Sequence, residues 1–108
     1  MNEYTIPILM KKMPDAFQPD RAVGIDAIIL FNITGNDHSE WTVIIKDQIC
    51  SVTKGIVANP QLTLTADSKD CLDIFTGRIE GTRAFMQGKL KLAGDIALAM
   101  KLLGLFKI

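Results

Sequence analysis

His38 is the single histidine of the chain and the first residue to consider for acid–base chemistry. It lies in the polar run 36–40, directly before Ser39, so a base and a hydroxyl are neighbours in the sequence. Nucleophilic catalysis needs these two groups to meet in space, together with a third group that orients the base. Adjacency along the chain does not supply that geometry. We therefore expect residues 36–40 to form a solvated turn without catalytic residues.

The two cysteines could bind a metal or carry redox chemistry, but their spacing argues against both roles. Cys50 and Cys71 belong to no C-x-x-C motif and have no histidine nearby. In a cytosolic chain we expect two reduced, partly buried thiols. The glycines at 77, 81 and 88 also have the wrong spacing for a phosphate-binding loop. The sequence thus predicts no metal, no cofactor and no enzymatic activity.

Length and charge restrict the remaining classes of protein. The 108 residues are enough for one core, so we expect a single domain over residues 1–108. Lysine plus arginine equal aspartate plus glutamate at 12 each, which leaves no overall field to attract a nucleic acid. The longest uncharged apolar run, 96–100, is far below the ~20 residues of a membrane-spanning helix. Since the N-terminus lacks a signal-peptide pattern, we expect a cytoplasmic protein.

Apolar periodicity predicts the elements that would position a binding site. A helix over residues 5–17 is capped by Thr5 and should end or kink at Pro14. Strands are predicted at 25–34, 41–46, 49–54, 61–65 and 88–94. A short helical or turn segment is predicted from Pro19 towards Gly24, and helices are predicted between 67 and 77, at 82–86, and from Asp95 towards Phe106. Antiparallel-looking strands followed by grouped helices favour an α+β layer over a doubly wound α/β fold.

Two details of the predicted sheet follow from the same patterns. Strand 25–34 carries apolar groups on both faces, which indicates a central strand. Asp47 and Gln48 separate two β patterns and predict a two-residue hairpin.

The last helix has more apolar surface than one sheet contact requires. Its large side chains spread over well more than half of the circumference, with Lys101 on the remaining polar side. A helix on a sheet needs an apolar stripe only ~100° wide. The surplus must therefore meet something else: a second layer of its own core, a ligand, a partner protein or a bilayer surface.

Residues 84–102 have the sequence AFMQGKLKLAGDIALAMKL, which resembles the C-terminal signature of the sterol carrier protein type-2 family. The resemblance extends upstream. Residues 41–47, WTVIIKD, are similar to the second strand of that family, and residues 60–67, PQLTLTAD, are similar to its later strand and the following helix start. The chain resembles the free-standing microbial members of the family.

The resemblance implies a five-stranded, mostly antiparallel sheet covered by helices on one face. It also implies an apolar tunnel, closed by the C-terminal helix, for fatty acids, fatty acyl-CoA, phospholipids or sterols. Members of the family have no catalytic residues. The lining residues implied for this chain are Phe75, Phe85, Met86, Leu90, Leu92, Ile96, Met100, Leu103 and Phe106.

The residues leave other interpretations open. Three lysines have two interpretations: they would transiently contact an anionic headgroup or a membrane surface, or they would simply be solvated. These are Lys89, Lys91 and Lys101. The apolar C-terminal helix would also suit a structural or interaction module that uses it for homodimerisation or for docking to a partner. A small hydrolase or isomerase would need a paired acid or base, and the sequence nominates none.

Overall fold

The protein folds as a five-stranded mixed sheet with helices, an α+β architecture. The structure, a computed structural model, describes residues 5–106, apart from the side chains of Asp37 and Leu103. The strands are β1 (Ala27–Thr34), β2 (Ser39–Lys46), β3 (Ile49–Lys54), β4 (Leu62–Asp67) and β5 (Leu90–Gly94). The helices are α1 (Ile6–Ala16), α2 (Ser68–Phe75), α3 (Gly81–Met86) and α4 (Ile96–Leu102). Short 3-10 segments are η1 (Pro19–Arg21), η2 (Gly35–Asp37) and η3 (Leu103–Leu105).

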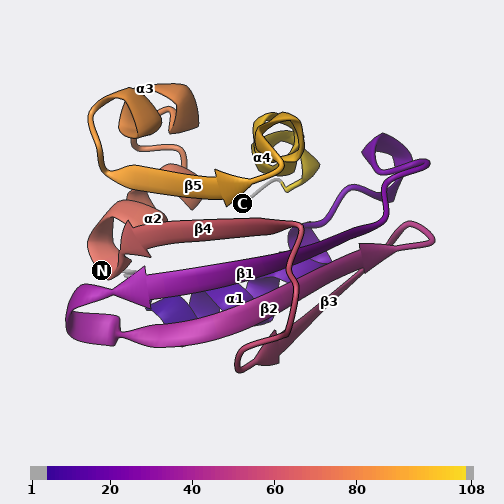
Figure 1. The fold of residues 1–108 in the computed structure, drawn as a ribbon, viewed down its shortest axis with the longest axis horizontal. Helices are drawn as coiled ribbons and strands as arrows, with labels where there is room; N and C mark the ends of the chain where they lie inside the picture. The colour runs from indigo at the N-terminus through magenta and orange to yellow at the C-terminus, as the bar shows by residue number, and fades with distance from the viewer. Residues whose placement is uncertain (1–4, 107–108) are drawn as a thin grey trace.

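The strand order is β3-β2-β1-β4-β5, which makes β1 the central strand, as its two apolar faces predict. Only the β1–β4 pair is parallel among the strand pairs of residues 5–106. It is parallel because the chain leaves β3 and crosses in front of β2 and β1 before it enters β4 (Figure 1). The Gln61 side chain holds this crossing in place: its Oε1 accepts from the Ile28 amide and its Nε2 donates to the Asp26 carbonyl.

One face of the sheet, here called the inner face, carries the core. The register brings Phe31 opposite Leu64, and Leu64 opposite Leu92. Inner-face residues of β1, β2 and β4 and the buried sides of α1, α2 and α4 form one apolar cluster. Figure 1 shows α1 behind the sheet and α3 and α4 at its β5 edge. The helices therefore cover the inner face.

Helix α1 begins as predicted, and it extends beyond Pro14. The Thr5 hydroxyl accepts from the Ile8 amide and caps the helix. Its buried side consists of Ile6, Leu9, Met10 and Met13. Pro14 lies inside the helix, which continues to Ala16 rather than ending at the proline. A proline this near the C-terminal end disturbs only the last turn, and burial of the apolar side outweighs that cost.

The hairpin between β2 and β3 has the two-residue turn that the sequence predicts. Asp47 and Gln48 have φ of 52° and 62°, the left-handed values that a type I′ turn requires at both positions. Such a turn matches the right-handed twist of the strands, so it fixes the register of Lys46 opposite Ile49.

The C-terminal segment differs from a single helix running towards Phe106. The Asp95 carboxylate caps α4 by accepting from the Leu98 amide at 3.0 Å. The α-helix ends at Leu102, a 3-10 turn follows, and Phe106 is extended and forms an antiparallel bridge with Phe17. Gly104 disfavours further helix. Residues 95–106 are called the C-terminal strap below.

Candidate functional site

Phe75 and Phe106, two of the predicted lining residues, meet in an aromatic cluster at the end of the C-terminal strap. Their ring centroids are 6.5 Å apart, in an edge-on arrangement. Phe106 also lies 5.6 Å from Phe17, and Phe75 lies 5.6 Å from Phe31. Residues of the helix α2, of the strand β1, of the segment that follows α1 and of the C-terminal strap thus converge at this point. Phe17 and Phe31 were not predicted as site residues, although both occupy apolar positions of predicted elements.

Leu90 and Leu92 also point towards the core, from the edge strand β5. Leu90 pairs with Ala66 and is 4% exposed, whereas Leu92 pairs with Leu64 and is only partly buried. Alternation along the strand puts both side chains on the inner face. Leu92 therefore lies where the core borders solvent, next to the strap.

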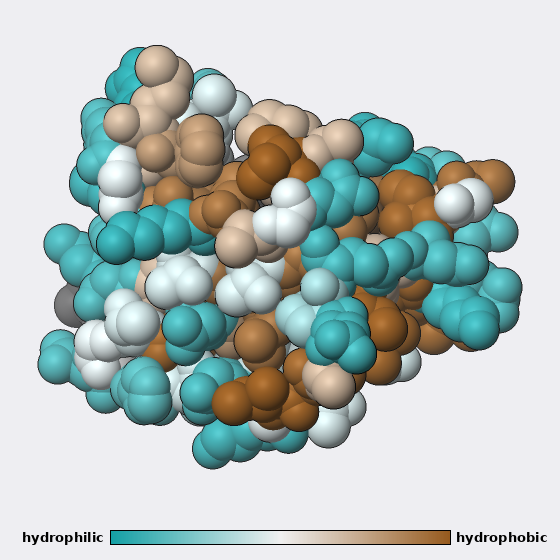
Figure 2. All heavy atoms as spheres, viewed as in Figure 1, coloured by the Kyte–Doolittle hydropathy of each residue, from teal (hydrophilic) through white to brown (hydrophobic). Residues whose placement is uncertain are grey.

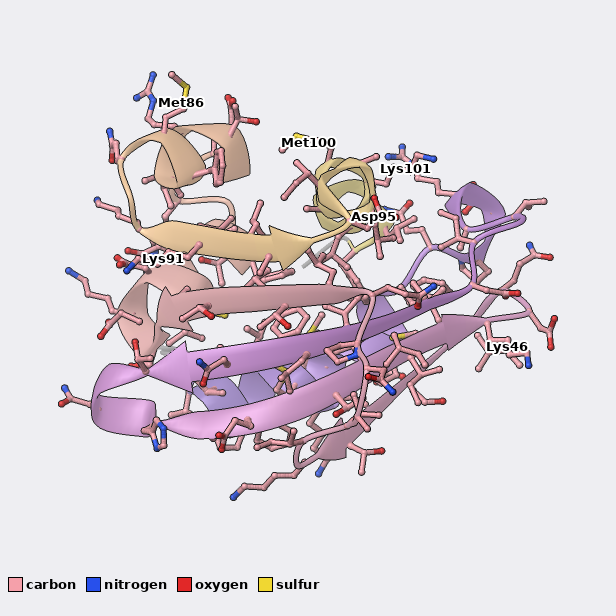
Figure 3. The ribbon with its side chains drawn as sticks, viewed as in Figure 1. Lys46, Met86, Lys91, Asp95, Met100 and Lys101 are labelled. Carbon is pink, nitrogen blue, oxygen red and sulfur yellow. The ribbon has the colours of Figure 1, made fainter. Side chains whose placement is uncertain are left out.

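Four other predicted lining residues lie on the surface. Phe85 and Met86 of α3 are 40% and 80% exposed, and Ile96 and Met100 of α4 are 43% and 53% exposed. Figure 3 shows Met86 and Met100 on the same edge of the molecule, with Met100 on the side of α4 that faces α3. Figure 2 shows tan and brown side chains over these two helices. The side chain of Leu103, the ninth predicted residue, lies outside the described part.

The apolar surplus of the last helix is divided between the core and the surface. Leu98, Ala99 and Leu102 are buried against the sheet, while Ile96 and Met100 form a separate exposed stripe one helical turn apart. Lys101 is exposed as well, on the other side of α4 from Met100 (Figure 3). One helix thus has both a core-facing side and an exposed apolar side.

The strap is held at both ends. At its start, the Asp95 amide donates to the Gln61 carbonyl at 2.9 Å. At its end, the Gln18 amide donates to the Leu105 carbonyl at 2.8 Å, and Arg21 donates to the Gly104 carbonyl at 3.4 Å. The middle of the strap is held by apolar packing alone, as far as the described hydrogen bonds go. Its central part can therefore move with little loss of hydrogen bonding.

Two hollows lie at the end of the sheet where α2 and α3 meet β5. The larger has a volume of about 520 Å³ between α2, α3 and Lys89. The smaller has a volume of about 260 Å³ and lies between Thr34, Asp67 and Lys91. Both are lined mainly by polar residues, so neither is the predicted apolar tunnel. An apolar tunnel stays a prediction.

The groups with nucleophilic or acid–base chemistry do not gather at this site. Burial raises the pKa of the Cys50 thiol to about 11 and that of the Cys71 thiol to about 12. Both thiols are thus protonated and unreactive near neutral pH. His38 is exposed at the end of η2, in the connection between β1 and β2. Within the described residues, no group of three or more histidine, cysteine or acidic side chains is placed to hold a metal ion.

No helix in the described part of the chain is long and apolar enough to cross a membrane. The longest described helix, α1, has 11 residues.

Fold and site together define a class of small α+β domain that buries an aromatic cluster between its sheet and a C-terminal strap. The chain belongs to the SCP-2 sterol transfer family, whose model matches residues 9–107. Sequence relatives include human hydroxysteroid dehydrogenase-like protein 2, which is 33% identical over 89 residues. They also include peroxisomal multifunctional enzyme A of Dictyostelium discoideum, 36% identical over 80 residues. These matches cover 82% and 72% of this chain but only 21% and 18% of the relatives.

Solved structures share the fold over nearly the whole chain. The solution structure of palmitated SCP2L2 from Aedes aegypti has a TM-score of 0.78 and 26% identity, and covers 94% of this chain and 93% of that one. The inverting sec-alkylsulfatase Pisa1 from a Pseudomonas species has a TM-score of 0.85 at 17% identity, over 97% of this chain and 17% of the enzyme. The second similarity shows the fold alone. The prediction of a sterol carrier protein type-2 fold is confirmed.

Proposed function

We propose that this protein binds and carries an apolar lipid, such as a fatty acid, fatty acyl-CoA, phospholipid or sterol-like molecule, between the inner face of the sheet and the C-terminal strap. The observation that carries the proposal is the strap itself. It ends in a buried aromatic cluster and is fixed by hydrogen bonds at its two ends, with apolar packing between them. The similarity to a palmitated protein over 94% of the chain supports the same conclusion.

The ligand enters by displacing the middle of the strap. An acyl chain there would replace contacts of Leu98 and Leu102 by contacts of its own methylenes, each worth about 0.8 kcal/mol when it leaves water. Leu92 lies at the border between core and solvent, so it is the natural first contact. The exposed stripe of Ile96 and Met100, with Phe85 and Met86 on α3, becomes the rim of the opening and contacts a membrane surface transiently during transfer.

The proposed role is non-catalytic and cytoplasmic. The thiols are buried and protonated, and His38 is exposed in the turn between β1 and β2, so binding is the chemistry that this arrangement favours. The relatives named as enzymes are about five times longer than their match to this chain, and their reactions are not carried over to it.

The test is a titration of a fluorescent fatty-acid analogue against wild type and Leu92→Trp. The larger side chain would fill the opening, and we expect the dissociation constant to rise at least about tenfold. The matched control is Ile44→Trp, since Ile44 is 37% exposed on the opposite face of the sheet. Native mass spectrometry of the purified protein would detect co-purified lipid. Absence of saturable 1:1 binding by wild type, or equal binding by both variants, would refute the proposal.

A second candidate is an interaction module that dimerises or docks a partner through α3 and α4. The 80% exposure of Met86 favours it, because large apolar side chains on a surface are often covered by a partner. Sedimentation of wild type and Met86→Asp separates the two proposals. If wild type is a dimer and the Met86→Asp variant is a monomer, the interaction module is supported. If wild type and variant are both monomers, the carrier is supported.

A further inference from the structure

The larger hollow combines positive charge with access to the core. It lies at the junction of α2, α3 and the start of β5, with a volume of about 520 Å³. Its lining includes the cationic side chains of Arg78, Arg83 and Lys89 and the amide of Gln87. Figure 1 shows α3 projecting beyond β5, and Figure 2 shows teal side chains around it.

Two turns of the backbone place two of these three cationic residues, Arg78 and Lys89. The Arg78 amide donates to the Asp73 carbonyl at 2.8 Å, and the Lys89 amide donates to the Ala84 carbonyl at 2.9 Å. The turns that close in this way need left-handed backbone at Gly77 and Gly88, with φ of 83° and 77°. The turns thus bring Arg78 and Lys89 to the same hollow as Arg83 of α3, although 11 positions separate Arg78 from Lys89.

The acidic residues of the hollow neutralise only part of this charge. Arg78 Nη1 lies 3.9 Å from Asp73 Oδ1, a long and exposed ion pair. Glu80 also lines the hollow. Neither Arg83 nor Lys89 has a carboxylate partner among the described residues. The lining of the hollow thus carries three cations and two carboxylates. Its net charge is positive, which favours the binding of an anion.

Ile79 connects the hollow to the core. It lines the hollow on one side and packs against the core cluster on the other. On the adjoining helix, Phe85 and Met86 are exposed. A ligand with its anionic group in the hollow can therefore extend an apolar chain past Ile79.

From this juxtaposition we propose that the hollow binds the phosphate-bearing head group of an acyl ligand, with Arg83 and Lys89 as its principal contacts. The inference rests on the proposed lipid-carrier function and names its ligand class. A guanidinium donates two parallel hydrogen bonds to a phosphate, and an ammonium adds a point charge. A simple fatty acid carries a single carboxylate and leaves most of this hollow unused.

The experiment measures dissociation constants of palmitoyl-CoA, palmitoyl lysophosphatidic acid and palmitate for the full chain by calorimetry. The variant is Arg83→Gln/Lys89→Gln, in which both residues are exposed, so the fold is retained. The control is Lys11→Gln/Lys46→Gln, which removes two exposed cations elsewhere; Lys46 lies at the other end of the sheet (Figure 3). We expect the variant to bind a phosphate-bearing ligand at least about tenfold more weakly and palmitate unchanged, with the control like wild type.

The outcomes distinguish the two proposals. A selective loss for palmitoyl-CoA, for the lysophospholipid or for both supports the inference and identifies the source of the phosphate. Equal affinity of variant and wild type for both phosphate-bearing ligands, with palmitate still bound, overturns this inference alone. Failure of wild type to bind any of the three acyl ligands overturns the lipid-carrier function, and the inference with it.

Discussion

The backbone at Gly94 permits a close approach that no other residue would allow. Gly94 has a φ of 107°, and a Cβ at this position would lie 2.3 Å from the Gln61 carbonyl oxygen. The same oxygen accepts from the Asp95 amide at the start of the strap. Gly94 thus joins the end of β5 to the hydrogen bond that holds the strap.

Replacing Gly94 by alanine should destabilise the protein by about 2–4 kcal/mol, from left-handed backbone strain and the steric clash together. Gly24→Ala is the matched control, because Gly24 also has a positive φ, 78°, but no atom within 4 Å of the added Cβ. It should lose only about 1 kcal/mol. Urea unfolding measures both free energies of unfolding, and equal losses would show that the contact with Gln61 is unimportant.

At the scale of elements, the strap depends on Phe106 for its attachment. Phe106 is 8% exposed and contacts the rings of Phe17 and Phe75. Its bridge with Phe17 joins the strap to the segment that follows α1. The end of the strap is therefore anchored by a buried ring in addition to its hydrogen bonds, while its middle packs by apolar contacts.

Phe106→Ala should lower the free energy of unfolding by about 3 kcal/mol, because a large buried ring is lost and the cavity cannot fully close. Amide hydrogen exchange should accelerate first in residues 96–105 and little in β1, since the strap opens locally. Met86→Ala serves as control: Met86 is 80% exposed, and we expect less than about 0.5 kcal/mol. Uniform acceleration across the whole sheet would contradict a separately opening strap.

At the scale of the whole molecule, the carrier function predicts that stability follows ligand concentration. Palmitate at one hundred times its dissociation constant should raise the free energy of unfolding by about 2.7 kcal/mol. For a chain of this size that corresponds to a rise in melting temperature of about 10 °C. Scanning calorimetry of wild type measures the shift.

The control varies protein concentration without lipid. A tenfold increase should leave the melting temperature of a monomeric carrier unchanged, whereas a dimer would become more stable. A melting temperature that rises with protein concentration but does not change when palmitate is added would support the interaction module.

Much of the fold follows from local patterns along the chain. Thr5 and Asp67 cap their helices, Asp47 and Gln48 form the predicted turn, and Gly77 follows α2. These features depend on neighbours within a few residues, so the sequence alone determines them. The resemblance of residues 84–102 to a known family indicated the class of fold, a five-stranded, mostly antiparallel sheet with helices, but not which strands pair.

The tertiary structure decided which apolar residues are buried and which are exposed. Helical periodicity does not distinguish Ile96 from Leu102, because both are large apolar residues of the same helix. Only Leu102 is buried against the sheet, because α4 lies at the edge formed by β5. The sequence likewise gave no reason to group Arg78, Arg83 and Lys89, which the turns at Gly77 and Gly88 bring around one hollow. Local propensity acts over a few residues, whereas burial and a shared hollow depend on elements packed from distant parts of the chain.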